Sequence, residues 1–113
     1  MPRTPWRTAI DQLRRDNRSG AAEITRRALD MLIDAVGDSV PGTAGAYRAT
    51  LVRLSRQLMA AQPAMAPLFR LVNDMLWEVG DAPSGGAMRL GALTYLQEYQ
   101  ARHEAALEAL AQR

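Results

Sequence analysis

Two short stretches of this chain have the residue types and spacing that bind anions or polar ligands. In the first, Arg18-Ser19-Gly20-Ala21 stands at the start of a run with helical periodicity. A helix N-terminus offers unpaired N–H groups and a positive dipole end to an anion, and an arginine beside it adds a bidentate contact to phosphate. We therefore predict a phosphate or ligand site at Arg18, Ser19, Gly20 and Ala21. The alternative is ordinary helix capping, with Gly20 allowing close approach of another helix.

The second stretch is a corner, Gln62-Pro63-Ala64-Met65-Ala66-Pro67, followed by Asn73 in an otherwise apolar helical run. The two prolines make the corner stiff, because each fixes its own backbone and restricts the preceding residue. Gln62 and Asn73 are candidates for supporting a ligand held at the first stretch. The alternative is a connecting loop and one buried amide that hydrogen-bonds to a neighbouring backbone.

Residues suited to catalysis or metal binding are scarce. The chain has no cysteine, which excludes a thiolate metal site and a cysteine nucleophile, and His103 is its one histidine. No nucleophile elbow surrounds a serine, and the carboxylates are spread over expected helix surfaces. We therefore predict no catalytic residue, no metal and no cofactor, and we do not expect the chain alone to be an enzyme.

The elements that must position these residues are helices. Apolar residues make up 48% of the 113-residue chain and aromatic residues only 5%, which favours an aliphatic core between close-packed helices. Stripes of helical period separated by Gly and Pro joints predict helices near 5–16, 20–36, 46–62, 67–79 and 87–112. Thr4-Pro5 is the expected start of the first helix. We predict a single all-α domain over 1–113, a five-helix, mainly antiparallel bundle with a long C-terminal helix.

Charge and hydropathy indicate whether the chain is expected to bind nucleic acid or contact a membrane. Its 14 basic residues are all arginine and are interleaved with 12 acidic ones, for a net charge of +2. Such mixing is typical of a solvated surface, so we expect no nucleic-acid partner. No signal peptide and no apolar run of the ~20 residues that a membrane span needs are visible. We therefore expect a cytoplasmic protein without membrane contact.

Three stretches together resemble the N-terminal helical domain of the initiation factor 2B alpha/beta/delta family, which includes isomerases of ribose-1,5-bisphosphate and methylthioribose-1-phosphate. The run from Asp16 to Ile24, with Arg27-Ala28-Leu29, looks like the family's Gly-Ala helix start. Gln62 to Leu68, with Asn73 downstream, looks like its Arg-Pro…Leu…Asn segment. The closing helix, Tyr95–Arg113, looks like the one that leads into the second domain. Here Ser19 separates Arg18 from Gly20, and Gln62 stands where the isomerases carry Arg.

The resemblance implies a non-catalytic domain that acts in protein–protein contact, in translation initiation, and that lines a sugar-phosphate or nucleotide site in a longer protein. Its partners would be its own C-terminal domain or a homologous subunit, and it would form homo-oligomers. The family's catalytic Cys and Asp lie in a C-terminal Rossmann-like domain, which we expect to be absent here. The alternative is a substrate-side fragment of a sugar-phosphate isomerase, with Arg18 and Ser19–Ala21 holding a phosphorylated sugar. A third alternative is a free-standing bundle that dimerises through its last helix.

Overall fold

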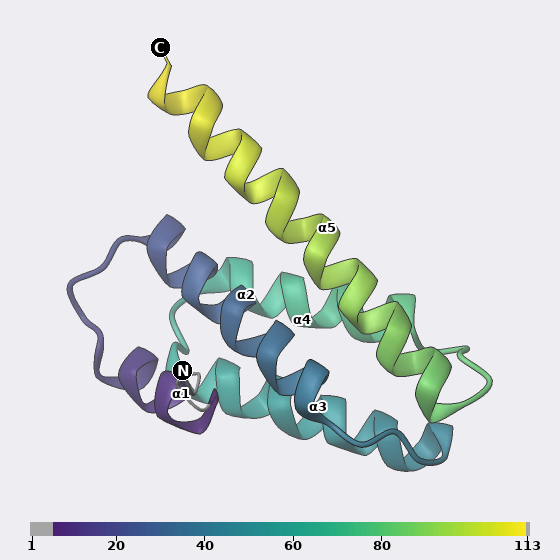
Figure 1. The fold of residues 1–113 in the computed structure, drawn as a ribbon. Coiled ribbons are helices and arrows are strands. Elements are labelled where there is room, and N and C mark those ends of the chain that lie inside the picture. The colour runs from purple at the N-terminus through teal and green to yellow at the C-terminus, as the bar shows by residue number, and fades with distance from the viewer. Residues whose placement is uncertain (1–5, 113) are drawn as a thin grey trace.

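The computed structural model describes residues 6–112, which form five α-helices and no strand (Figure 1). In chain order the helices are α1 (Trp6–Arg15), α2 (Ala21–Asp38), α3 (Ala44–Ala61), α4 (Ala66–Glu78) and α5 (Gly85–Ala111). They pack mainly antiparallel, and α5, with 27 residues, is the longest. The predicted all-α bundle with a long C-terminal helix is confirmed. The predicted helix start at Thr4-Pro5 lies outside the described residues.

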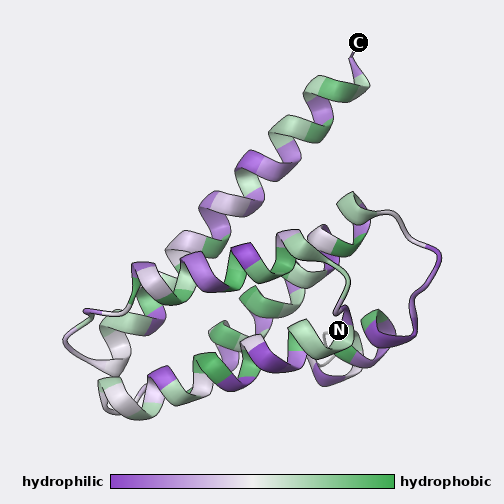
Figure 2. Cartoon of the chain, turned by 180° about the vertical axis from the view of Figure 1, so that it is seen from behind, coloured by the Kyte–Doolittle hydropathy of each residue, from purple (hydrophilic) through white to green (hydrophobic). Residues whose placement is uncertain are grey.

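The core is aliphatic and lies where the apolar stripes of the helices meet (Figure 2). Leu32 on α2 and Leu71 on α4, in the middle of their stripes, have no exposed surface. The expected inner face of α3 is buried throughout, at Tyr47, Leu51, Leu54, Leu58 and Ala61. Periodicity therefore assigned these helix faces correctly, because a stripe of period 3.6 can be buried only on one side of a helix.

Helix starts differ from the predicted ones where a hydroxyl residue caps the first turn. The Ala46 N–H donates to Thr43 Oγ1 over 3.1 Å, and α3 begins at Ala44. Likewise, Ser84 caps α5 through the Ala87 N–H, also over 3.1 Å. The glycines before Ala87, assigned to a flexible joint, are therefore the first turn of α5, since a side-chain cap stabilises helix where glycine alone would not.

The loop between α2 and α3 meets the start of α5 through two glycines. The Gly85 N–H donates to the Gly42 carbonyl oxygen over 3.1 Å. A Cβ atom on Gly85 would lie 2.2 Å from that same oxygen, so the backbones can approach this closely only without a side chain. One turn further along α5, Arg89 donates to the carbonyl oxygens of Val36 (3.2 Å) and Gly37 (2.6 Å), which caps the C-terminal end of α2.

The two halves of α5 have different surroundings. Met88, Ala92 and Leu96 in the first half are buried among the other helices. In the second half, Gln100 and His103 still contact α2. The part after His103 projects beyond the bundle (Figure 1), and Leu110 there exposes 60% of its surface. The helical spacing of Leu96, His103, Leu107 and Leu110 would predict one inner side for all four, and for Leu110 this prediction is wrong. Its spacing continues the stripe of α5, but no other helix reaches that far.

Candidate functional site

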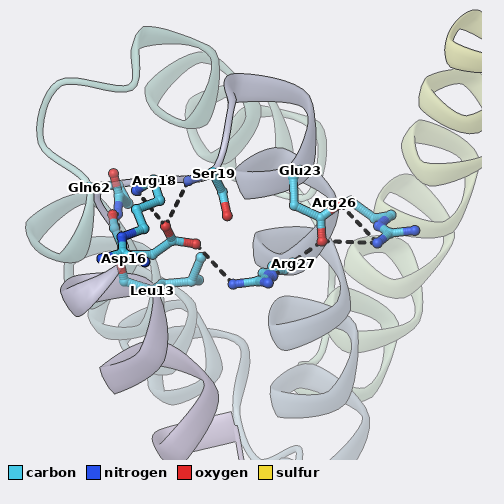
Figure 3. Close-up of polar contacts among 8 residues, drawn as sticks. All are labelled: Leu13, Asp16, Arg18, Ser19, Glu23, Arg26, Arg27 and Gln62. Carbon is cyan, nitrogen blue, oxygen red and sulfur yellow. Dashed lines mark hydrogen bonds and ion pairs between the residues drawn. The ribbon is translucent and has the colours of Figure 1, made fainter.

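The predicted anion site already faces a carboxylate of the chain itself. Asp16 Oδ1 accepts hydrogen bonds from the N–H groups of Arg18 and Ser19, both over 2.9 Å (Figure 3). Its second oxygen, Oδ2, lies 2.9 Å from Arg27 Nη1 on the next helix. Of the donors that the predicted site would offer a phosphate, the Ser19 N–H is therefore already bound to Asp16, together with the neighbouring Arg18 N–H and the Arg27 guanidinium.

These contacts stabilise the charged form of Asp16. A hydrogen bond from the Ser19 side chain, then the N–H groups of Ser19 and Arg18, and the charge of Arg27 hold the pKa of Asp16 at about 2. Beside them, Glu23 pairs with Arg26 at 2.8 Å and with Arg27 at 3.2 Å. The hydrogen bond from Arg26 lowers the pKa of Glu23. The turn and the first helical turn thus form one network of opposite charges.

The predicted ligand residues Arg18, Gly20 and Ala21 are all exposed at this turn. Gly20 is the N-cap of α2, and no side chain caps the helix there. No atom lies within 4 Å of the place where a Cβ on Gly20 would be. The alternative of close helix approach at Gly20 is therefore wrong, because the neighbouring space is open.

Gln62 and Asn73, the predicted supporting residues, lie in different surroundings. Gln62 Nε2 donates to the carbonyl oxygens of Leu13 and Asp16, the latter over 3.0 Å, so the corner after α3 reaches the Asp16 turn. Asn73 is exposed on α4, and among the described residues no hydrogen bond joins it to that turn. The buried amide expected at Asn73 is wrong, and the half-buried Gln62 amide is the one that binds neighbouring backbone.

A second surface, between α4 and α5, was missed by the sequence-based predictions. Here a groove of about 470 Å³, which we call the α4–α5 groove, runs along α5 beside the loop that joins it to the end of α4. Its apolar wall consists of Val79, Ala82, Pro83, Ala87, Leu90 and Tyr95. Leu90 exposes 66% of its surface, and Trp77, directly before the groove-lining Glu78, exposes 89%. An exposed leucine within an apolar groove wall is a feature typical of contact surfaces.

Acidic side chains line the edges of the α4–α5 groove. Glu78 contributes from the end of α4 and Glu98 from α5, and no arginine is among the lining residues. Burial raises the pKa of Tyr95 in the groove wall, and the negative charge of Asp74 adds to this effect. The charged residues that line the groove are therefore both acidic.

A signal for this surface was present in the sequence of α5. Ala87, Leu90, Gly91 and Thr94 follow helical spacing on a face other than that of Leu96. Because apolar residues occur on more than one side of α5, the helix has more apolar surface than one core can cover.

On α1 and α3 the chain forms a groove of opposite charge. It has a volume of about 560 Å³, and its apolar floor includes Val52. Arg14, Arg53 and Arg56 line it, and α3 carries no acidic residue. The two grooves therefore differ in the sign of their lining charges, with carboxylates in the α4–α5 groove and guanidinium groups in this one.

Within residues 6–112, no group of three His, Asp or Glu side chains is placed to hold a metal ion. None of the helices in this range is both long enough and apolar enough to cross a membrane. Comparisons with protein-family models, curated proteins and solved structures found no match for this chain.

Proposed function

We propose that this chain is a non-catalytic helical module that binds another protein through the α4–α5 groove. The observation that carries the proposal is Leu90, which stays 66% exposed in an apolar groove wall. Covering one such leucine contributes about 1–2 kcal/mol.

The shape of the groove favours a protein partner. It is formed by one face of α5, by the loop that precedes α5 and by Glu78 at the end of α4, and it follows α5 from Ala87 to Glu98. At 1.5 Å per residue this is roughly 16 Å, or three helical turns. A surface of this length matches a helix from a partner, whose apolar residues at spacings of three and four enter the groove.

The resemblance to the initiation factor 2B family agrees with this proposal, since it implies a helical domain in protein–protein contact. Membership of that family, a role in translation initiation and a homologous subunit as partner stay predictions.

Sugar-phosphate binding at Arg18, Ser19, Gly20 and Ala21 stays a prediction with weaker support. Asp16 takes two of the N–H groups there, although the N-cap lacks a side-chain bond. A phosphate titration followed by amide NMR shifts, on the natural chain and on Arg18→Ala, tests it directly.

A neutral amphipathic peptide tests the docking proposal. We would use a peptide of about 18 residues, long enough to be helical when bound, with leucines on one face and glutamines on the other. It should shift the amide signals of Leu90, Gly91 and Thr94. Leu90→Lys should abolish these shifts by placing a charge in the apolar wall.

The matched control is Leu110→Lys, because Leu110 is 60% exposed on the same helix but lies outside the groove. Binding should be unchanged in this variant. Absence of shifts in the natural chain, or equal loss of binding in both variants, would contradict the proposed function.

A further inference from the structure

We infer that the α4–α5 groove selects a basic amphipathic helix, with Arg or Lys residues on both sides of its apolar face, in a partner protein. This inference rests on the proposed function and adds the chemistry of the partner. It follows from the acidic residues that line an otherwise apolar groove.

The acidic residues stand on both walls. Glu78 lines the groove from α4, and Asp74 lies one turn earlier on the same side of that helix. Glu98 lines it from α5. A helix seated on Leu90 would therefore meet a carboxylate from each of the two helices, which suits cationic side chains beside its apolar face.

The nearby arginines offset part of this negative charge without pairing with Glu78 or Glu98. Arg48 donates to the Gly80 carbonyl oxygen beside the groove, and the charge of Arg102 acts on Tyr95 in the groove wall. Arg89 is occupied with the carbonyl oxygens at the end of α2. Arg102 lies over the Tyr99 ring, 5.8 Å from its centroid, and is not among the residues that line the groove. No ion pair in the described chain involves Glu78 or Glu98. Both carboxylates are thus available to a partner.

Anionic partners are disfavoured by the same charges. An acidic helix, a nucleic acid or an anionic membrane surface would place negative charge against Glu78 and Glu98, which lowers affinity. The groove between α1 and α3, lined by Arg14, Arg53 and Arg56, is better suited to such partners. The two surfaces must therefore be distinguished in any binding experiment.

The test compares three peptides that share one leucine pattern and differ only on the polar face, which carries Gln, Arg or Glu. Amide NMR on the full chain locates binding at Gly91 and Thr94, and titration gives the Kd. At about 50 mM salt the Arg peptide should bind at least about tenfold more tightly than the Glu peptide in the α4–α5 groove. At about 300 mM salt the difference should shrink, because exposed charges are screened.

Paired glutamine variants identify the charges responsible. Glu78→Gln with Glu98→Gln should reduce the preference for the Arg peptide at least about threefold. The control, Glu104→Gln with Glu108→Gln, makes the same charge change on the projecting half of α5 and should leave the preference intact.

The possible failures are distinct. Equal Kd values for the three peptides, with binding still lost in Leu90→Lys, would overturn the basic-partner inference and leave the groove as a docking site. An equal effect of the two double variants would also overturn the inference, since the preference would then reflect overall charge. Absence of groove shifts with every peptide would overturn the proposed function as well.

Discussion

The two ends of α2 are held in place by different means. At the N-terminal end, an exposed turn is held by nearby side chains, chiefly Asp16 with Arg27. At the C-terminal end, the carbonyl oxygens of Val36 and Gly37 accept hydrogen bonds from Arg89, 53 and 52 residues away in sequence. Both ends also receive other contacts, from Gln62 and His103 at the first and from Ser39 at the second. The clearest difference is therefore exposure, because the charged contacts of Asp16 with Arg18 and Arg27 are exposed, whereas those of Arg89 are half-buried.

This difference shows that residues of one type have unequal roles. Gly20, at the exposed end, has open space around it, whereas Gly85, beside the opposite end, lies against the backbone of Gly42. Substitutions at the exposed turn should therefore be tolerated far better than those at the packed end. Three experiments test this contrast.

The largest effect is expected for Gly85→Ala. The new Cβ would lie 2.2 Å from the Gly42 oxygen, and because the obstacle is backbone, α5 or the loop must shift. We expect the free energy of unfolding to fall by about 1–3 kcal/mol, as in other overpacked sites. Urea unfolding followed by circular dichroism measures this loss.

Gly20→Ala is the matched control for that experiment. Alanine is a poorer N-cap than glycine, but it lowers the entropy of the unfolded chain, so the two effects oppose each other. We expect a change within about 0.5 kcal/mol. Equal destabilisation by the two substitutions would show that the ends of α2 do not differ as described.

An intermediate effect is expected for Arg89→Ala. The substitution removes two hydrogen bonds from a charged donor to the end of α2 and should cost about 1–2 kcal/mol, because the site is partly open to water. Arg70→Ala on the surface of α4 is the control and should have little effect. If thermal unfolding shows equal losses in both variants, Arg89 does not stabilise the C-terminal end of α2.

The smallest effect at neutral pH is expected for Asp16→Asn. The asparagine oxygen can still accept from the N–H groups of Arg18 and Ser19, but the ion pair with Arg27 is lost. In the natural chain, the pKa of Asp16 is lowered on folding from 3.8 to about 2. Its carboxylate therefore stabilises the folded state above pH 3.8, and this contribution disappears as the pH falls through about 2.

The fall in Tm at low pH distinguishes the contribution of Asp16 from that of other carboxylates. Between pH 4 and about 2 the natural chain should lose more stability than Asp16→Asn, measured as the fall in Tm. The control, Asp81→Asn in the α4–α5 loop, should keep the acid dependence of the natural chain. Parallel curves for the natural chain and Asp16→Asn would exclude the described role of Asp16.

The positions of the helices were predictable because apolar stripes and Gly or Pro breaks are recognised within short stretches of sequence. The stripe through Leu71 and the glycine and proline joints are visible within a few residues, and they define α4 without knowledge of the fold. The Asp16 contacts were also within reach of sequence reasoning. An aspartate two or three residues before free N–H groups is a known turn former, although the predicted site comprised Arg18, Ser19, Gly20 and Ala21 without Asp16.

Other features depend on partners far along the chain. Gln62 reaches the Asp16 carbonyl oxygen 46 residues away, and which helix end Arg89 caps is decided only when the bundle is assembled. The same holds for Leu90 and Leu110, which resemble core residues in the sequence. Periodicity shows that a leucine belongs to a stripe, but not whether another helix is present to cover it.

The unequal surroundings of α5 imply that a single helix unfolds in stages. Beyond His103, whose Nε2 lies 3.1 Å from the Ala22 carbonyl oxygen, the helix depends mainly on its own backbone hydrogen bonds. An isolated segment of about two turns is not stable in water, so the segment after His103 stays helical only as an extension of the packed part of α5. Amide protons there exchange through local fraying, whereas those near Ala92 and Leu96 exchange only when the bundle opens. The helix is thus continuous in structure but divided in its protection from solvent.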